Sequence, residues 1–274
     1  MDPFAALFAH ATPTARTFFA GTLCQTTQYN EGGHLHLFMA GAVRVVGIGK
    51  AEFELREPTL LFCPRARAHS FAVDLARGAD LVCATVEFGG AEGNPIGQGL
   101  PEFVLLPLAA HPALEPVCNL LIGEAFAEGG GRQVALDRLF DYLLILIVRH
   151  VVESGAVSSG VLAGLSDPRL ARALTAIHEA PKKPWTLADL ADVAGMSRTR
   201  FAEHFRTRIG QTPIDYLTAW RMTVARQFLA RGKPVKSVAL QVGYRSAAAF
   251  SRVFSRVTGQ APRSAQLLRA ADEP

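Results

Sequence analysis

The chain has 274 residues, of which 49% are hydrophobic and 19% charged, and its net charge is +4. This length favours two domains with real cores. The apolar run 142–148 is too short, and its flanks are too charged, to span a bilayer, so we expect no membrane partner. No basic segment precedes an apolar stretch at the N-terminus, so we expect no signal peptide. Both observations favour a cytoplasmic protein.

The charge is divided unevenly along the chain. Residues 168–274 contain 18 Lys and Arg against 7 Asp and Glu, a net charge of +11, whereas residues 1–167 contain 10 against 17, a net charge of −7. A basic segment attracts nucleic acid because its cations release the counterions condensed on phosphates. The C-terminal part is therefore a candidate DNA-binding domain.

In the N-terminal part, short runs of β-forming residues alternate with turn residues from about residue 17 to residue 88. The runs that we predict as strands are 25–29, 34–39, 44–48, 52–55, 60–63, 68–73 and 81–88. Short strands at this spacing are typical of a closed antiparallel sheet, either a barrel or a jelly roll. We expect residues 1–110 to form this domain.

Two helices are predicted next, at about 112–127 and at 133–153. The second places five apolar side chains on one face, those of Leu136, Phe140, Leu143, Leu144 and Val148. We interpret residues 111–155 as a dimerisation segment; the alternative is that the second helix packs only against its own barrel. The Ser- and Gly-rich residues 156–166 are the expected linker.

The last third of the chain contains one structural unit twice. Gly195, Phe201, Phe205, Gly210 and Pro213 recur, 48 or 49 residues later, as Gly243, Phe250, Phe254, Gly259 and Pro262. Each copy has a turn, an N-capping hydroxyl (Ser197, Ser246), a helix with two Phe one turn apart and a Gly-x-x-Pro exit. This pattern predicts two helix-turn-helix units. A helical repeat array is the alternative, but two copies are too few for one and the positive charge would be unexplained.

The helices predicted around these turns are 168–179, 186–192, 197–208, 213–231, 235–241 and 246–257. Asp167 before Pro168 favours a helix start, and Thr186 with Asp189 resembles a capping box. The helix 213–231 is expected to act as a rigid spacer between the two units.

The second helix of each unit is expected to read DNA, because its two Phe face inward and leave polar and small residues outside. Thr199, Ala202 and Glu203 suit base edges, Arg206 suits phosphate, and Arg252 suits guanine or phosphate. The full set of candidate DNA contacts is Arg198, Thr199, Ala202, Glu203, Arg206, Arg245, Ser246, Ala247, Ala248, Ser251 and Arg252. For each arginine the alternative is a solvated surface charge.

These residues carry a family resemblance. The motifs concerned are Leu190-Ala191, Ala194-Gly195-Met196-Ser197, Phe201…Phe205, Gly210-Gln211-Thr212-Pro213, Tyr216-Leu217, Arg221, Ala225, Leu229, Ala239, Val242-Gly243-Tyr244 and Phe250-Ser251-Arg252-Val253-Phe254. Together they resemble the AraC/XylS DNA-binding domain, here over 167–270, whose two helix-turn-helix units enter successive major grooves about 34 Å apart. The resemblance implies double-stranded promoter DNA, a second copy of the chain and RNA polymerase as partners. One departure is Ala265-Gln266, where the family usually has Tyr-Arg.

The N-terminal part is similar to the cupin-like sensor domains of that family. The expected fold class is therefore α+β: an antiparallel cupin-like β-barrel with a helix pair, followed by an all-α domain with two helix-turn-helix motifs.

Three histidines of the barrel are candidate metal ligands. His34 and His36 share one face of a strand, and His69 ends a later strand at a position that resembles the second cupin motif. Three imidazoles can hold Zn²⁺, although no cofactor is certain. The Glu that cupin enzymes place after His-x-His is missing from 37–44, which counts against redox-metal catalysis. The alternatives are ordinary core histidines or the lining of a ligand pocket.

Cys24 and Cys83 form a second candidate sensor. Their placement resembles AraC-type regulators that respond to reactive chlorine or other oxidants through a cysteine pair. A disulfide between them would close a loop of about 60 residues, worth on the order of 4 kcal/mol in the chain-entropy model. The alternative is two inert buried thiols, and Cys63 and Cys118 are expected to be core residues.

The sequence thus predicts a DNA-binding transcription regulator, not an enzyme, whose N-terminal domain receives an oxidant, a metal or a small ligand as its signal. The alternatives are a metal-dependent cupin enzyme fused to a DNA-binding module, and a purely architectural DNA binder, which would leave the acidic half without a role.

Overall fold

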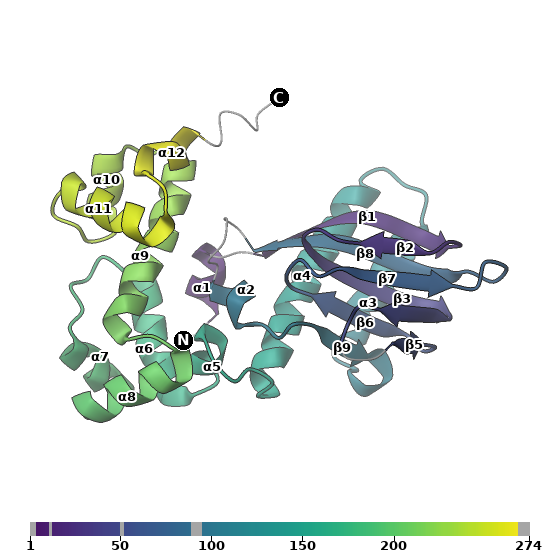
Figure 1. Ribbon diagram of the computed structural model, residues 1–274, viewed down its shortest axis with the longest axis horizontal. Helices are drawn as coiled ribbons and strands as arrows, with labels where there is room; N and C mark the ends of the chain where they lie inside the picture. Colours follow the sequence, from purple (N-terminus) through teal and green to yellow (C-terminus); the bar gives the residue numbers. More distant parts are fainter. Residues whose placement is uncertain (1–3, 11–12, 50–51, 89–94, 268–274) are drawn as a thin grey trace. The chain divides into compact units, whose positions relative to one another are not determined.

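The computed structural model describes residues 4–10, 13–49, 52–88 and 95–267 (Figure 1). The chain divides into two compact units. We call Pro13–Gly89 with Leu100–Ala156 the sheet unit, and Met1–Thr12 with Gly90–Gly99 and Val157–Pro274 the helical unit.

The sheet unit contains two antiparallel sheets. Their strand orders are β1-β8-β3-β6-β9 and β2-β7-β4-β5. The strands of the first are β1 (Pro13–Leu23), β8 (Ala79–Phe88), β3 (Gly33–Gly41), β6 (Thr59–Cys63) and β9 (Val104–Pro107). Those of the second are β2 (Thr27–Tyr29), β7 (His69–Val73), β4 (Val43–Val46) and β5 (Phe53–Leu55).

The core of this unit lies between the two sheets. Phe38 and Leu81 from the first sheet and Val45 and Phe71 from the second belong to one buried cluster. The predicted α+β class with N-terminal antiparallel sheets is confirmed. The sheets do not close into a barrel, however, because among the described residues β1 and β9 form no hydrogen-bonded ladder with β2 or β5.

The outer strands β1 and β9 escaped the sequence analysis. β9 is only four residues long and ends at a proline, and β1 lies entirely ahead of 25–29, the first run that we predicted. β1 is an edge strand whose free N–H groups are met by side chains: Asp141 Oδ1 accepts from the Ala15 N–H and Asp137 Oδ1 from the Thr17 N–H, both at 2.8 Å. The two carboxylates protect this edge from pairing with another chain.

Those carboxylates belong to α4 (Arg132–Glu153), which packs on β1 and on α3 (Glu115–Phe126). The apolar face predicted for the helix at 133–153 is confirmed, since all five of its side chains are buried. A short 3-10 helix, η1 (Leu108–Ala110), precedes α3.

The helical unit gathers ten helices from the described residues of three chain segments. They are α1 (Ala5–His10), α2 (Pro95–Gly99), α5 (Val161–Leu165), α6 (Pro168–Glu179), α7 (Leu187–Ala194), α8 (Arg198–Ile209), α9 (Pro213–Ala230), α10 (Val235–Gln241), α11 (Ala247–Thr258) and, last in the chain, α12 (Pro262–Leu267). α1 packs on α6 and α9, and α2 packs on α5. Residues 268–270 of the expected domain lie outside the described residues. No described helix is long and apolar enough to cross a membrane.

The predicted helix starts are mostly confirmed. Asp167 caps α6, Thr186 and Asp189 form a reciprocal capping box on α7, and Ser246 caps α11. The cap predicted at Ser197 is wrong in one respect: its backbone has the N-cap conformation, with ψ 150°, but its exposed hydroxyl accepts no bond from the first turn of α8.

Candidate functional site

The helical unit contains two helix-turn-helix motifs, α7–α8 and α10–α11. Phe201 and Phe205 of α8 are fully buried, and so are Phe250 and Phe254 of α11. The inward anchoring predicted from the repeat is therefore confirmed.

None of the eleven predicted DNA contacts is buried: Ala202, Ala247 and Ser251 are half-buried and the rest are exposed. The hydroxyl of Ser246 is occupied as a cap, because it accepts from the Ala249 N–H at 3.1 Å. The sequence analysis did not include Arg200, an exposed cation on α8 that follows Thr199 directly and lies one turn ahead of the candidate Glu203.

The two motifs are fixed to one another through α9, which packs against the helices of both. Arg221 of α9 donates from Nε to the Pro181 carbonyl at 2.7 Å and from Nη2 to the Lys183 carbonyl at 2.9 Å. Gly243, in the turn of the second motif, has φ +89°, and a Cβ there would lie 2.8 Å from the Lys182 carbonyl oxygen. The second motif thus packs against the chain segment that precedes the first motif. This contact fixes the distance between the two helices that are expected to read DNA.

The departure at Ala265-Gln266 does not leave the last helix loose. Gln266 Nε2 donates to the Lys233 carbonyl at 2.7 Å, and α12 packs along α9.

In the sheet unit, the three candidate histidines converge. His34 and His36 on β3 and His69 on β7 are buried, and each offers a ring nitrogen within 4.8 Å of the others. The Nε2 atoms of His36 and His69 are 3.0 Å apart. His69 Nδ1 lies 2.7 Å from the Arg67 carbonyl, to which it donates, so the Nε2 of His69 carries the lone pair that faces the cluster. We call these three residues the histidine cluster.

The surroundings keep these imidazoles neutral. Burial, with help from neighbouring His69, lowers the pKa of His34 to about 4 and that of His36 well below its usual value. Burial also lowers the pKa of His69, although the hydrogen bond to the Arg67 carbonyl acts in the opposite direction. The Nδ1 atoms of His34 and His36 have no hydrogen-bond partner among the described residues. Neutral imidazoles with unused nitrogen atoms are the form that binds transition metals.

Aromatic residues surround the histidine cluster. Tyr29 stacks on His69 with ring centroids 5.0 Å apart, and Phe18, 47% exposed at a bulge of β1, lies 5.9 Å from His34. The sequence analysis did not identify either residue, because neither side chain is a metal ligand. The one indication for Tyr29 is its position at the end of a predicted strand, next to a turn.

The structure does not bring Cys24 and Cys83 together. Both thiols are free; Cys24 is exposed just after β1, while Cys83 is buried in β8. Leu23 pairs with Ala79 and Phe19 pairs with Cys83, so the two cysteines are separated along β8 by about 13 Å, beyond the reach of a disulfide. Cys83 instead lies opposite His36 in the β3–β8 ladder and contacts Tyr29.

Comparison with known proteins places both units. The family described as Cupin matches residues 2–153, and the family described as Helix-turn-helix domain matches residues 190–266. An uncharacterized HTH-type transcriptional regulator of Haemophilus influenzae is 30% identical, covering 81% of this chain and 82% of its own. A putative AraC-like transcription regulator of Streptomyces lividans is 40% identical over 72% of this chain and 67% of its own. RclR of Escherichia coli (strain K12), an RCS-specific HTH-type transcriptional activator, is 28% identical over 83% and 81%.

Proposed function

Because this chain belongs to the AraC-like family of helix-turn-helix transcriptional regulators with an N-terminal cupin domain, we propose that its DNA binding is controlled by a metal ion bound at the histidine cluster. The observation that carries the proposal is the convergence of three buried imidazoles whose ring nitrogens lie within 4.8 Å. The Nδ1 atom of His34 supports it further, because buried polar nitrogens without a partner among the described residues are rare in folded proteins unless something binds them.

The donor set fits Zn²⁺ best. Three neutral nitrogen ligands suit this ion, and no carboxylate from the described part of the chain completes the set that redox-metal cupins use. His69 would be held in its ligating orientation by the Arg67 carbonyl, as second-shell partners do in other metal sites. Bound Zn²⁺ would cross-link the two sheets, because His36 belongs to the first sheet and His69 to the second.

The test uses the full-length, metal-free protein. Zn²⁺ is titrated in competition with a chromophoric chelator, and DNA from upstream of the protein's own gene is titrated with and without Zn²⁺. We expect one ion per chain, with a change in DNA affinity, and loss of both in His36→Ala and His69→Ala. His150→Ala removes a half-exposed histidine outside the cluster and is the matched control. Absence of stoichiometric binding would contradict the metal-sensing role and leave the regulator assignment in place.

A second candidate signal is an oxidant acting on Cys24 and Cys83. It is supported by the Escherichia coli relative, which is named as RCS-specific, and by the exposure of Cys24. Because the two thiols are far apart, a bond between them requires β1 and β8 to rearrange, and that rearrangement would be the switch. Hypochlorite treatment should then change DNA affinity in the wild type and not in Cys24→Ser; an equal response of the variant excludes this pair.

The DNA contacts proposed are the eleven residues on and beside α8 and α11, together with Arg200.

We further propose a cytoplasmic homodimer that contacts RNA polymerase. The contact with RNA polymerase is supported by the Escherichia coli relative, which is named a transcriptional activator. The dimer is supported by apolar side chains of α3 and α4 that are each more than half exposed: Leu120, Phe126, Val134 and Tyr142. A monomer by light scattering, or a dimer that Tyr142→Glu leaves intact, would refute this interface.

A further inference from the structure

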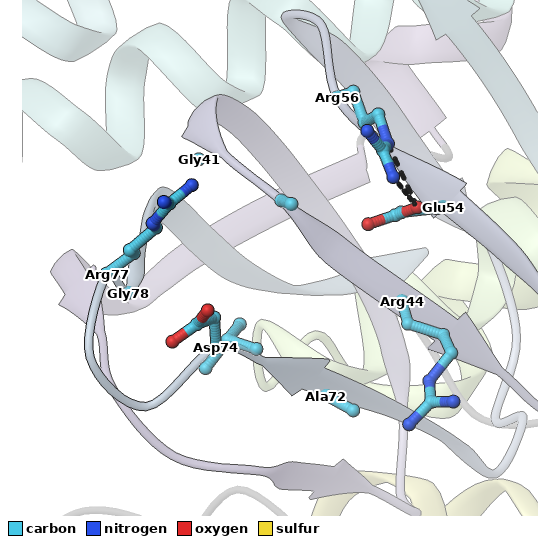
Figure 2. A pocket seen from close by; sticks show the side chains of 10 residues that line it. Gly41, Arg44, Glu54, Arg56, Ala72, Asp74, Arg77 and Gly78 are labelled. Atoms are coloured by element: carbon cyan, nitrogen blue, oxygen red, sulfur yellow. Dashed lines mark hydrogen bonds and ion pairs between the residues drawn. The ribbon is translucent and has the colours of Figure 1, made fainter.

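A groove on the outer face of the second sheet has the character of a separate ligand site (Figure 2). Its volume is about 750 Å³, and it is lined by β4, β5, β7 and the turn between β7 and β8. On β4, Val43 and Val45 point into the core, so Arg44 between them points out into the groove. The groove and the histidine cluster therefore lie on opposite faces of the same sheet.

The hollow has a structural cause. Arg44 stands opposite Ala72 of β7, whose side chain is a single methyl group, so the floor of the groove is low. At one end the turns before β4 and before β8 meet, since a Cβ on Gly41 (φ +94°) would lie 2.6 Å from the Gly78 carbonyl oxygen. Any larger residue at position 41 would force these turns apart.

Three arginines line this groove in a unit that is otherwise acidic. Figure 2 shows Arg77 on one wall, and Arg44 with the Arg56–Glu54 pair on the other. Arg56 is already neutralised, because its Nε and Nη2 donate to Glu54 Oε2 at 2.9 and 2.8 Å.

The other two guanidinium groups are available. Arg44 makes only a long ion pair, with Nη1 4.0 Å from Glu52 Oε2. The backbone N–H of Arg77 donates to the Asp74 carbonyl at 3.3 Å, but its guanidinium group has no hydrogen bond or ion pair with any described residue. The nearby Asp74 holds the turn, since its Oδ1 accepts from the Ala76 N–H at 2.8 Å, and it forms no ion pair with Arg77 among the described residues. Two guanidinium groups without a hydrogen-bonded carboxylate thus flank a floor of small apolar side chains.

We propose that this groove binds a small organic anion, with Arg44 and Arg77 holding its carboxylate or phosphate groups and Ala72 contacting its carbon skeleton. Guanidinium groups bind both kinds of anion through paired hydrogen bonds. The ligand would act on β7, whose inner face carries His69, and so would adjust the sensor from outside the core.

The test is calorimetric titration of the full-length protein at physiological salt with citrate, glutarate and inorganic phosphate. We expect saturable binding by at least one probe. Arg44→Ala and Arg77→Ala should each weaken it by about tenfold or more, and Arg56→Ala less, because Glu54 already occupies that side chain. Arg16→Ala, an exposed arginine on β1, is the matched control.

All four arginines are exposed, so equal thermal midpoints of the free variants would verify folding. Binding by citrate or glutarate alone assigns a carboxylate ligand, and binding by phosphate alone assigns a phosphorylated one. No saturable binding by any probe up to about 10 mM, or equal binding by Arg44→Ala, Arg77→Ala and the wild type, would overturn the proposal. Neither result depends on metal binding at the histidine cluster, so failure of this proposal and failure of the proposed function can be told apart.

Discussion

Replacing Gly243 by alanine tests whether the two helix-turn-helix motifs are fixed to one another. Gly243 has φ +89°, and an added Cβ would lie 2.8 Å from the Lys182 carbonyl oxygen and 3.1 Å from Arg221 Nη2. The carbonyl belongs to the backbone and cannot turn away. The substitution therefore pushes the turn of the second motif off the segment to which Arg221 is also bonded.

Two effects add. A positive φ costs about 1 kcal/mol for a residue with a Cβ, and forcing a methyl group into a packed contact costs about 1–3 kcal/mol. Gly243→Ala should thus lower the free energy of unfolding of the helical unit by about 2–4 kcal/mol, or the midpoint temperature by about 4 °C for each kcal/mol. Gly232→Ala is the control, because Gly232 has φ +75° and no atom of the described residues lies within 4 Å of its Cβ position. The control should lose about 1 kcal/mol.

The assay is thermal unfolding of both variants, followed by DNA titration at a temperature where both are folded. We expect Gly243→Ala to bind the upstream DNA about tenfold or more weakly, because displacing the second reading helix removes at least one base or phosphate contact. Gly232→Ala should bind as the wild type does. Equal destabilisation by the two substitutions would refute the close approach at Gly243, and unchanged DNA affinity would refute the rigid spacing.

Three further outcomes are expected. Burial alone would raise the pKa of Asp167, but hydrogen bonds from His204 and from two backbone N–H groups lower this pKa below its usual value. The ionised carboxylate therefore stabilises the folded protein fully above about pH 4, and this stabilisation is lost as the pH falls further. Asp167→Asn keeps the cap without the charge, so its midpoint temperature should fall less from pH 5 to pH 3, and parallel curves would contradict this. Ellman's reagent should modify one thiol of the native chain quickly, that of Cys24, because burial raises the pKa of the other three; two fast thiols would be inconsistent with this burial. Arg252→Ala should weaken DNA binding by about 1–3 kcal/mol and Arg16→Ala should not, and equal affinity would make Arg252 a solvated charge.

The helical unit follows closely from the sequence because its signals are local. Paired Phe one turn apart, glycines after the helices and capping residues before them all act within a few positions, which is why α8 and α11 were predicted within two residues. The missing cap at Ser197 is a side-chain rotamer, which no spacing encodes.

The sheet unit was harder to predict because its features depend on register. Alternation along one strand places His34 and His36 on the same face, but only the pairing of strands decides whether His69 joins them. In the same way, nothing local to Cys24 or Cys83 says that Leu23 pairs with Ala79, and that pairing sets the thiols apart. Closure of a barrel is likewise a property of whole sheets.

The discontinuous helical unit has a practical consequence. Leu7 of α1 and Ile96 of α2 are fully buried, although the chain between and after them belongs to the sheet unit. A fragment cut at the apparent linker, residues 157–274, would carry both helix-turn-helix motifs and yet leave bare the apolar surfaces of α5, α6 and α9 that α1 and α2 cover. Expressed alone, such a fragment should be less soluble than the whole chain, and adding residues 1–12 and 90–99 in trans should restore it.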